Sequence, residues 1–157
     1  AFITGGLHMH ILEENLIVLD VKATTPEEAV LTVGNFLYEH GLVTKQYTQS
    51  ILSYFEKDIN SFLLGDMTAV VHSNEFNETL DNALVLIRLE HSVNFGKITN
   101  RPVRLLFGLV STNSESDMQL HHHVLDLLHN KNAFSAMLTE KTSESLHEVL
   151  KTHTLKE

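Results

Sequence analysis

The stretch TAVVHSNE, residues 68–75, places a histidine directly after a run of small and β-branched residues and before a polar turn. Such a run predicts a β-strand that ends at His72. In α/β sheets, reactive groups lie outside the carboxyl ends of strands, so the His72 ring is expected to project from that edge. A neutral imidazole can attack with one nitrogen while a hydrogen bond holds the other. From these residues alone, a structural or merely exposed histidine remains the alternative.

Three further histidines stand in a row at residues 121–123, in a segment that predicts a helix. Consecutive helical residues are about 100° apart, so the three rings cannot converge on one ion. His121 falls on the stripe that borders the core. His122, Asp126 and His129 share another stripe and have a spacing that suits a transition metal, although the same pattern is also typical of a solvated polar face.

The composition limits the classes of function. The chain has 157 residues, a net charge of −9 and no cysteine. An acidic protein repels nucleic acid and anionic lipid, so basic partners are favoured. The absence of cysteine excludes disulfides and a thiol nucleophile, and suits the cytoplasm. No apolar run reaches the length of a membrane span. The sequence contains neither a glycine-rich phosphate loop nor a G-x-S-x-G motif.

The elements that must position His72 can be predicted from periodicity and capping residues. Thr24 or Thr25 is expected to cap one helix that Gly41 ends, and Thr44 is expected to cap the next. The two predicted strands at 83–90 and 103–110 are apolar on both faces, as central strands covered by helices are. The predicted strands are 15–21, 68–72, 83–90 and 103–110, and the predicted helices are 23–41, 44–58, 117–129, 133–140 and 143–151. The predicted fold class is α/β: a single domain, residues 13–157, with a mixed β-sheet flanked by helices and residues 1–12 as an N-terminal extension.

The order of these blocks resembles a known family. NLIVLDVKATTPEEAVLTVGNFLYEHGLVTKQYTQSIL is similar to the opening of the mannitol/fructose-type (type 2) enzyme IIA of the bacterial phosphoenolpyruvate-dependent sugar phosphotransferase system. GDMTAVVH is similar to its G-x-x-x-A-I-P-H block, and ALVLIRLEHSVNFG and PVRLLFGLVSTNSESDMQLHHHVLDLL to its two central strands and following helix. FSAMLTEKTSESLHEVL resembles its closing helices. The likeness covers about residues 13–151.

The resemblance implies a function. His72 falls on the family's phosphorylated histidine, so the chain is expected to be a cytoplasmic phosphotransferase component for carbohydrate uptake. The phosphocarrier protein HPr would supply the phosphoryl group, and His72 would pass it to a cysteine of a IIB component that works with IIC. No metal or organic cofactor is implied. Amides at a helix N-terminus can receive phosphoryl oxygens.

Three positions depart from the family pattern. Val71 stands where the family has proline before the histidine. Asp117 stands where many members have a second histidine, and a carboxylate there is expected to hold the N–H of His72. Lys57 is the only candidate for the arginine that many members carry late in the second helix.

Two other functions stay open at this point. Domains similar to IIA also occur in bacterial sugar-operon regulators, where phosphorylation or IIB binding acts as a switch. A metal-binding or interaction module would use His122, Asp126 and His129 and leave His72 idle. For a phosphocarrier, an apolar docking patch is expected around His72, with contributions from Val71, Phe76 and Met118.

Overall fold

The computed structural model describes residues 2–4 and 7–153. Its sheet has the strand order β1-β2-β5-β6-β4, and β3 also pairs with β5. The strands are β1 (Phe2–Thr4), β2 (Leu7–Ile11), β3 (Ile17–Val21), β4 (Thr68–Val71), β5 (Ala83–Asn94) and β6 (Pro102–Val110). The helices are α1 (Pro26–Glu39), α2 (Tyr47–Lys57), α3 (Ser114–His129), α4 (Lys131–Thr139) and α5 (Ser143–Leu150), with short 3₁₀ turns η1 (Glu14–Leu16) and η2 (Ile59–Phe62).

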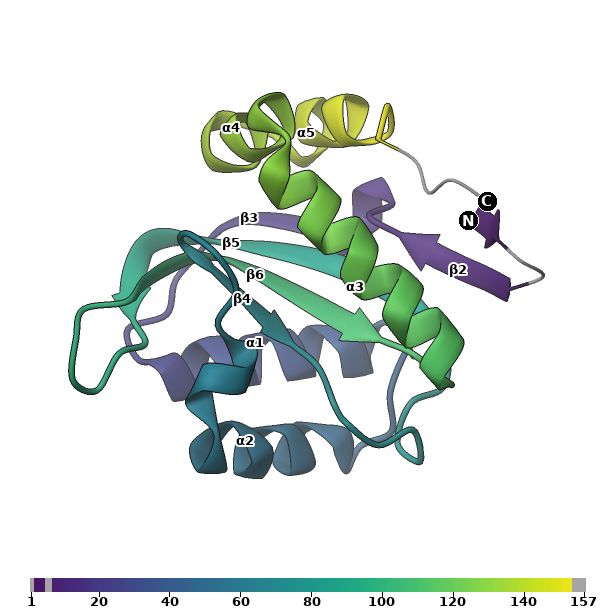
Figure 1. Ribbon diagram of the computed structural model, residues 1–157, viewed down its shortest axis with the longest axis vertical. Coiled ribbons are helices and arrows are strands. Elements are labelled where there is room, and N and C mark those ends of the chain that lie inside the picture. Colours follow the sequence, from purple (N-terminus) through teal and green to yellow (C-terminus); the bar gives the residue numbers. More distant parts are fainter. Residues whose placement is uncertain (1, 5–6, 154–157) are drawn as a thin grey trace.

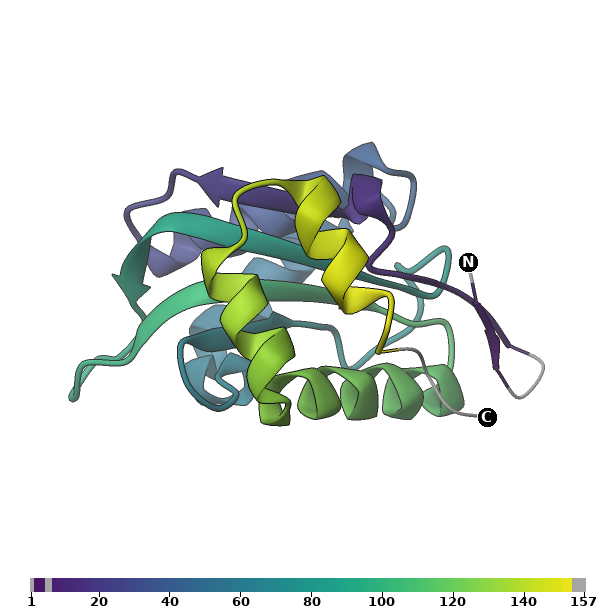
Figure 2. The ribbon, with the colours of Figure 1, turned by 90° about the horizontal axis from the view of Figure 1, so that it is seen from above.

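The helices cover both faces of this mixed sheet, as the apolar central strands predicted. Figure 1 shows α1 and α2 on one side of the sheet and α3, α4 and α5 on the other. In the view from above, α4 and α5 cross the face of the sheet (Figure 2). Each face has its own apolar core, because successive residues of β5 and β6 point to opposite sides. The predicted α/β architecture is therefore confirmed.

Side chains that cap the helices fix where several of them begin. Thr25 accepts a hydrogen bond from the Glu28 amide, and Pro26 opens α1 as expected. Asn113 caps α3 in the same way, so this helix begins three residues before the predicted start. The prediction that the Thr44 side chain caps α2 is wrong. The residue before α2 is Gln46, and the buried Thr44 hydroxyl has no hydrogen-bond partner in the described part of the chain.

The strand directions create the edge at which His72 lies. β4 runs parallel to β6, with Val71 opposite Gly108, whereas β5 runs antiparallel to β6. The carboxyl ends of β4 and β6 therefore meet at one edge, together with the start of β5. Gly108 allows close packing there, because a Cβ at this position would lie 2.7 Å from Val85 and 2.9 Å from Val33 of α1. The backbone that carries His72 is thus held against a tightly packed layer.

The sheet also extends into the segment that was expected to precede the domain. β2 pairs in parallel with β5 through His10 and Ile11, and Met9, Ile11 and Leu12 are buried in the core beneath α3 and α5. None of the described helices is both long enough and apolar enough to cross a lipid bilayer.

Candidate active site

His72 follows β4 directly and is half-buried at the carboxyl edge of the sheet. Its Nε2 lies 3.2 Å from the backbone carbonyl oxygen of Ser61 in η2. A carbonyl oxygen only accepts hydrogen bonds, so Nε2 carries the proton and donates. In the neutral ring, the other nitrogen, Nδ1, then has the lone pair. This is the tautomer of a nucleophilic imidazole whose orientation is fixed by the backbone.

Two aromatic rings from the α2 side of the sheet flank His72. The Phe62 ring is fully buried. Its centroid lies 5.3 Å from the centroid of the His72 ring, and the two ring planes are at 30°. Tyr54 of α2 meets the His72 ring edge-on at 6.1 Å and 87°. Because Phe62 and Ser61 are neighbours in η2, one short turn supplies both the ring contact and the hydrogen bond. The imidazole is therefore held on one side by a rigid wall.

A second histidine approaches His72 from the opposite helical layer. The His121 ring of α3 lies 5.2 Å from the His72 ring, at an angle of 82°. Figure 1 shows α2 and α3 on opposite sides of β4, so the two layers meet at the end of this strand. The helical periodicity placed His121 at the border of the core and gave no signal for this contact.

Asp117 supports His121 rather than His72. Its Oδ2 lies 3.7 Å from Nε2 of His121, and its Oδ1 accepts a hydrogen bond of 2.8 Å from the buried Ser111 hydroxyl. The nitrogen of His72 that Asp117 was expected to hold is bound by the Ser61 carbonyl instead. Asp117 and His121 are four residues apart and so share a helix face. This spacing is the signal in the sequence that predicts His121 beside Asp117.

The charge state of His121 depends on this environment. Burial lowers the pKa of His121 below its ordinary value, the Asp117 carboxylate partly opposes that shift, and His72 and His122 add to it. The net result is a His121 that favours the neutral form at neutral pH. The site thus contains two imidazoles side by side, of which His121 is biased toward its neutral form by burial.

A groove of about 420 Å³ adjoins His72 on the α2 side. Tyr54 and Lys57 of α2 form one wall, and Ser73, Asn74 and Glu75, which follow His72, form the other. Lys57, the candidate for the family's arginine, therefore lies at the rim of this groove. The edge-on contact with the His72 ring comes from Tyr54, one helical turn before Lys57.

The remaining sequence expectations fall elsewhere. Among residues 2–4 and 7–153, no three His, Cys, Asp or Glu side chains are placed to bind one metal ion, so His122, Asp126 and His129 do not form a ready site. Val71 is fully buried, and its expected part in a docking patch is wrong. Met118 is 55% exposed and remains available for docking.

Solved structures share this fold. The crystal structure of mannitol IIA from Escherichia coli matches with a TM-score of 0.76 and 24% identity over 88% of this chain and 97% of that one. A complex of mannitol IIA and phosphorylated mannitol IIB, also from Escherichia coli, matches with a TM-score of 0.78 and 23% identity over 92% and 99% of the chains.

Comparisons of sequence add a related protein and a matching family model. The mannitol-specific phosphotransferase enzyme IIA component of Bacillus subtilis is 23% identical over 141 residues, covering 88% of this chain and 94% of that protein. A family model described as the phosphoenolpyruvate-dependent sugar phosphotransferase system, EIIA 2, matches residues 10–153. The resemblance stated from the sequence is thereby confirmed. The chain belongs to this family of IIA phosphotransferase components.

Proposed function

We propose that the chain carries a phosphoryl group on His72, accepting it from phosphorylated HPr and passing it to a IIB component during carbohydrate uptake. The observation that carries this proposal is the hydrogen bond between His72 Nε2 and the Ser61 carbonyl, which leaves one imidazole nitrogen with its lone pair at the sheet edge. Membership of the IIA family supplies the class of reaction.

The first transfer exchanges one phosphorus–nitrogen bond for another. The free ring nitrogen of His72 attacks the phosphorus of the donor phosphohistidine in line with the bond that breaks. The donor imidazole leaves with the electron pair of that bond. In the second transfer, a nucleophile of IIB attacks the same phosphorus and His72 becomes the leaving group. Such transfers depend mainly on positioning and on stabilising the charge of the phosphoryl oxygens.

His121 is the residue placed to respond to that charge. In the free protein its pKa is lowered, chiefly by burial. A phosphoryl group on His72 brings negative charge close to His121, because the centroids of the two rings are 5.2 Å apart. That charge favours the protonated form of His121, which then stabilises the phosphoryl oxygens. The Asp117 carboxylate, whose Oδ2 lies 3.7 Å from Nε2 of His121, stabilises the positive charge of the protonated ring.

The partners meet the protein at the His72 edge in turn. One structural relative was solved as a complex of mannitol IIA with phosphorylated mannitol IIB. The groove between α2 and residues 73–78, together with exposed Met118, offers a mixed polar and apolar surface for such a partner. The chain's charge of −9 favours partners whose docking surface is basic. We place this exchange in the cytoplasm.

Labelling of the protein tests the proposal directly. After incubation with phosphoenolpyruvate, enzyme I and HPr, the wild-type protein should carry an acid-labile phosphoryl adduct. His72→Ala should carry none, because the attacking nitrogen is gone. His91→Ala is a matched control, since the His91 side chain is 86% exposed and lies on β5. A folded wild-type protein that stays unlabelled beside active upstream enzymes contradicts the proposal, and so does equal labelling of His72→Ala.

A further inference from the structure

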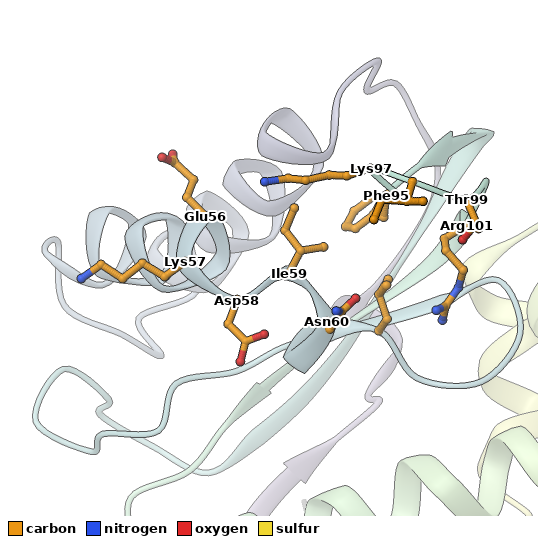
Figure 3. Close-up of a pocket in the computed structure, with 12 residues that line it drawn as sticks. Glu56, Lys57, Asp58, Ile59, Asn60, Phe95, Lys97, Thr99 and Arg101 are labelled. Atoms are coloured by element: carbon orange, nitrogen blue, oxygen red, sulfur yellow. The ribbon is translucent and has the colours of Figure 1, made fainter.

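A cavity of about 540 Å³ lies away from the His72 ring, which is not among the residues that line it. It is formed where the end of α2 and the start of η2 face the turn that joins β5 to β6 (Figure 3). Ligand pockets in proteins span roughly 300–1,000 Å³, so a small molecule fits. No role proposed above uses this cavity.

The turn that forms one wall is preorganised. The Asn94 side chain accepts hydrogen bonds of 2.8 Å from the backbone amides of both Gly96 and Arg101. The Phe95 amide also donates to the Arg101 carbonyl at 2.9 Å. A Cβ on Gly96 would lie 1.7 Å from the Thr99 carbonyl oxygen, so only glycine permits this turn. The wall therefore keeps its shape without a ligand, which reduces the cost of binding.

Two cations from that wall face the cavity without a protein partner. In the described part of the chain, the side chains of Lys97 and Arg101 take part in no ion pair or hydrogen bond. Figure 3 shows Lys97 reaching across above Ile59 and the Arg101 guanidinium on the Asn60 side, whereas the Lys57 amine points away. In a chain with 20 acidic and 11 basic residues, two unpaired cations at one cleft mark a local site for an anion. Arginine in particular matches the oxygens of a phosphate.

The opposite wall offers acceptors for hydroxyl groups. Asn60 of η2 lies on this wall, and Figure 3 shows its amide between Ile59 and Arg101, whereas the carboxylates of Glu56 and Asp58 point away from the cavity. The Asn60 amide both donates and accepts hydrogen bonds, so it can bind the hydroxyl groups of a ligand whose anionic group meets Lys97 and Arg101. The cavity therefore suits a ligand with a phosphate and a hydroxylated body.

The same short turn connects this cavity to His72. Ile59 and Asn60 line the cavity, and the next two residues of η2 are Ser61, which binds His72 Nε2, and Phe62, which packs against the ring. A ligand that contacts Ile59 and Asn60 therefore bears on the element that orients the imidazole. Coupling of this kind is reciprocal. The factor by which the ligand shifts the phosphorylation equilibrium of His72 is also the factor by which phosphorylation of His72 shifts the affinity for the ligand.

We infer that the cavity between η2 and the β5–β6 turn binds a small phosphorylated sugar or polyol and thereby adjusts the reactivity of His72. The regulatory part of this inference rests on the proposed phosphoryl transfer at His72. The binding part stands on the cavity itself and is measured without any upstream enzyme.

Calorimetric titration with glucose 6-phosphate tests binding, with glucose and inorganic phosphate as separate arms. Glucose 6-phosphate should bind more tightly than either. The double variant Lys97→Ser/Arg101→Ser should weaken its binding by about tenfold or more, since two charge-assisted contacts are lost. The double variant Lys131→Ser/Lys141→Ser removes two cations near α4 and should bind as the wild type does.

Nitrogen NMR of the His72 side chain, in the same titration, tests the link through η2. The ring signals should shift with glucose 6-phosphate in the wild type and stay unchanged in Lys97→Ser/Arg101→Ser. Equal binding by this variant and the wild type, or no binding at millimolar ligand, would overturn the site. Inorganic phosphate binding as tightly as glucose 6-phosphate would overturn the assignment to a sugar phosphate. If His72 cannot be labelled but the ligand still binds, only the proposed function fails; if His72 is labelled and no ligand binds, only this inference fails.

Discussion

At the scale of single residues, two side chains that contact His72 come from positions close to those at which the family pattern has an arginine and a second histidine. The ring of His72 is contacted by Tyr54 on the α2 side, where the sequence offered only Lys57 in place of an arginine. His121 contacts the ring from one helical turn after Asp117, and Asp117 is the position at which many family members have a second histidine. Val71 retains the backbone N–H that a proline would lack, and it continues β4 opposite Gly108. These substitutions preserve the hold on the imidazole.

The role of His121 is tested by variants that keep its size. His121→Gln should slow phosphoryl transfer by roughly 10- to 100-fold, because a positioned partner of the reacting group is lost. Asp117→Asn should slow it by a smaller factor, since the carboxylate acts through His121. In the wild type, phosphorylation of His72 should raise the pKa of His121, which an NMR titration of the imidazole would follow.

His129→Gln is the matched control, because it changes an exposed histidine at the far end of the same helix. Transfer by this variant should proceed at the wild-type rate. An unchanged rate in His121→Gln, or a pKa of His121 that stays the same on phosphorylation, would leave His121 a packing residue. An unchanged rate in Asp117→Asn would reduce Asp117 to a residue that stabilises the start of α3.

At the scale of elements, α3 presents different faces of the HHH run to different surroundings. His121 faces His72, whereas His123 is buried, with 4% of its surface exposed. Burial lowers the pKa of His123; the Asp126 carboxylate opposes this shift and His153 adds to it. Two histidines of one helix therefore resist protonation, so the packing of α3 on the sheet depends on pH.

The sign of that dependence follows from the lowered pKa values. Between the folded pKa and the ordinary value of about 6.5, the unfolded chain binds more protons than the folded one. The free energy of unfolding should therefore be greatest above about pH 6.5 and fall as the pH is lowered through this window, by at most about 1.4 kcal/mol per pH unit for each proton. Urea unfolding at pH values on both sides of this window measures it.

His123→Gln should reduce the loss of stability on acidification, because one of the two buried groups no longer titrates. His91→Gln changes an exposed histidine and should leave the slope as it is. A wild-type stability that stays constant or increases as the pH falls through the window would show that burial of these histidines does not govern the packing of α3.

At the scale of the whole molecule, the sheet separates two functional edges. The carboxyl ends of β4 and β6 carry His72, and the β5–β6 turn with its cavity lies at the other end of β5 and β6. Large apolar side chains are exposed toward both edges: Met118 of α3 and Leu80, which precedes the start of β5, toward the His72 edge, and Ile98, which is 99% exposed, on the turn. A partner that docks at His72 would cover Met118 and Leu80 but not Ile98.

Docking at the His72 edge predicts which surface changes matter. The double variant Met118→Ser/Leu80→Ser should lower the rate of phosphoryl transfer from HPr at limiting HPr concentration by about tenfold, through loss of apolar contact area. Ile98→Ser should have no such effect. Added salt should slow the encounter, because attraction between the acidic chain and a basic partner is screened. Equal rates for both variants would place the docking surface elsewhere.

Much of the fold could be predicted from the sequence because its determinants are local. Thr25, Pro26 and Gly41 specify the ends of α1, and the apolar runs of β5 and β6 mark them as central strands. The position of His72 after a short strand was likewise visible. The cap of α2 was not, because the Thr44 side chain faces a buried interior rather than the helix end.

By itself, the sequence determined the helices, the central strands and the place of His72 at the end of one of them, since propensity, periodicity and capping act over a few residues. Only the tertiary structure decided what His72 touches. The rotation of α3 about its axis brings His121 rather than Asp117 to the ring, and the path of η2 brings Ser61 and Phe62. These contacts join segments 11 and 49 positions apart in the chain, from 61 to 72 and from 72 to 121, and depend on how whole layers pack against the sheet.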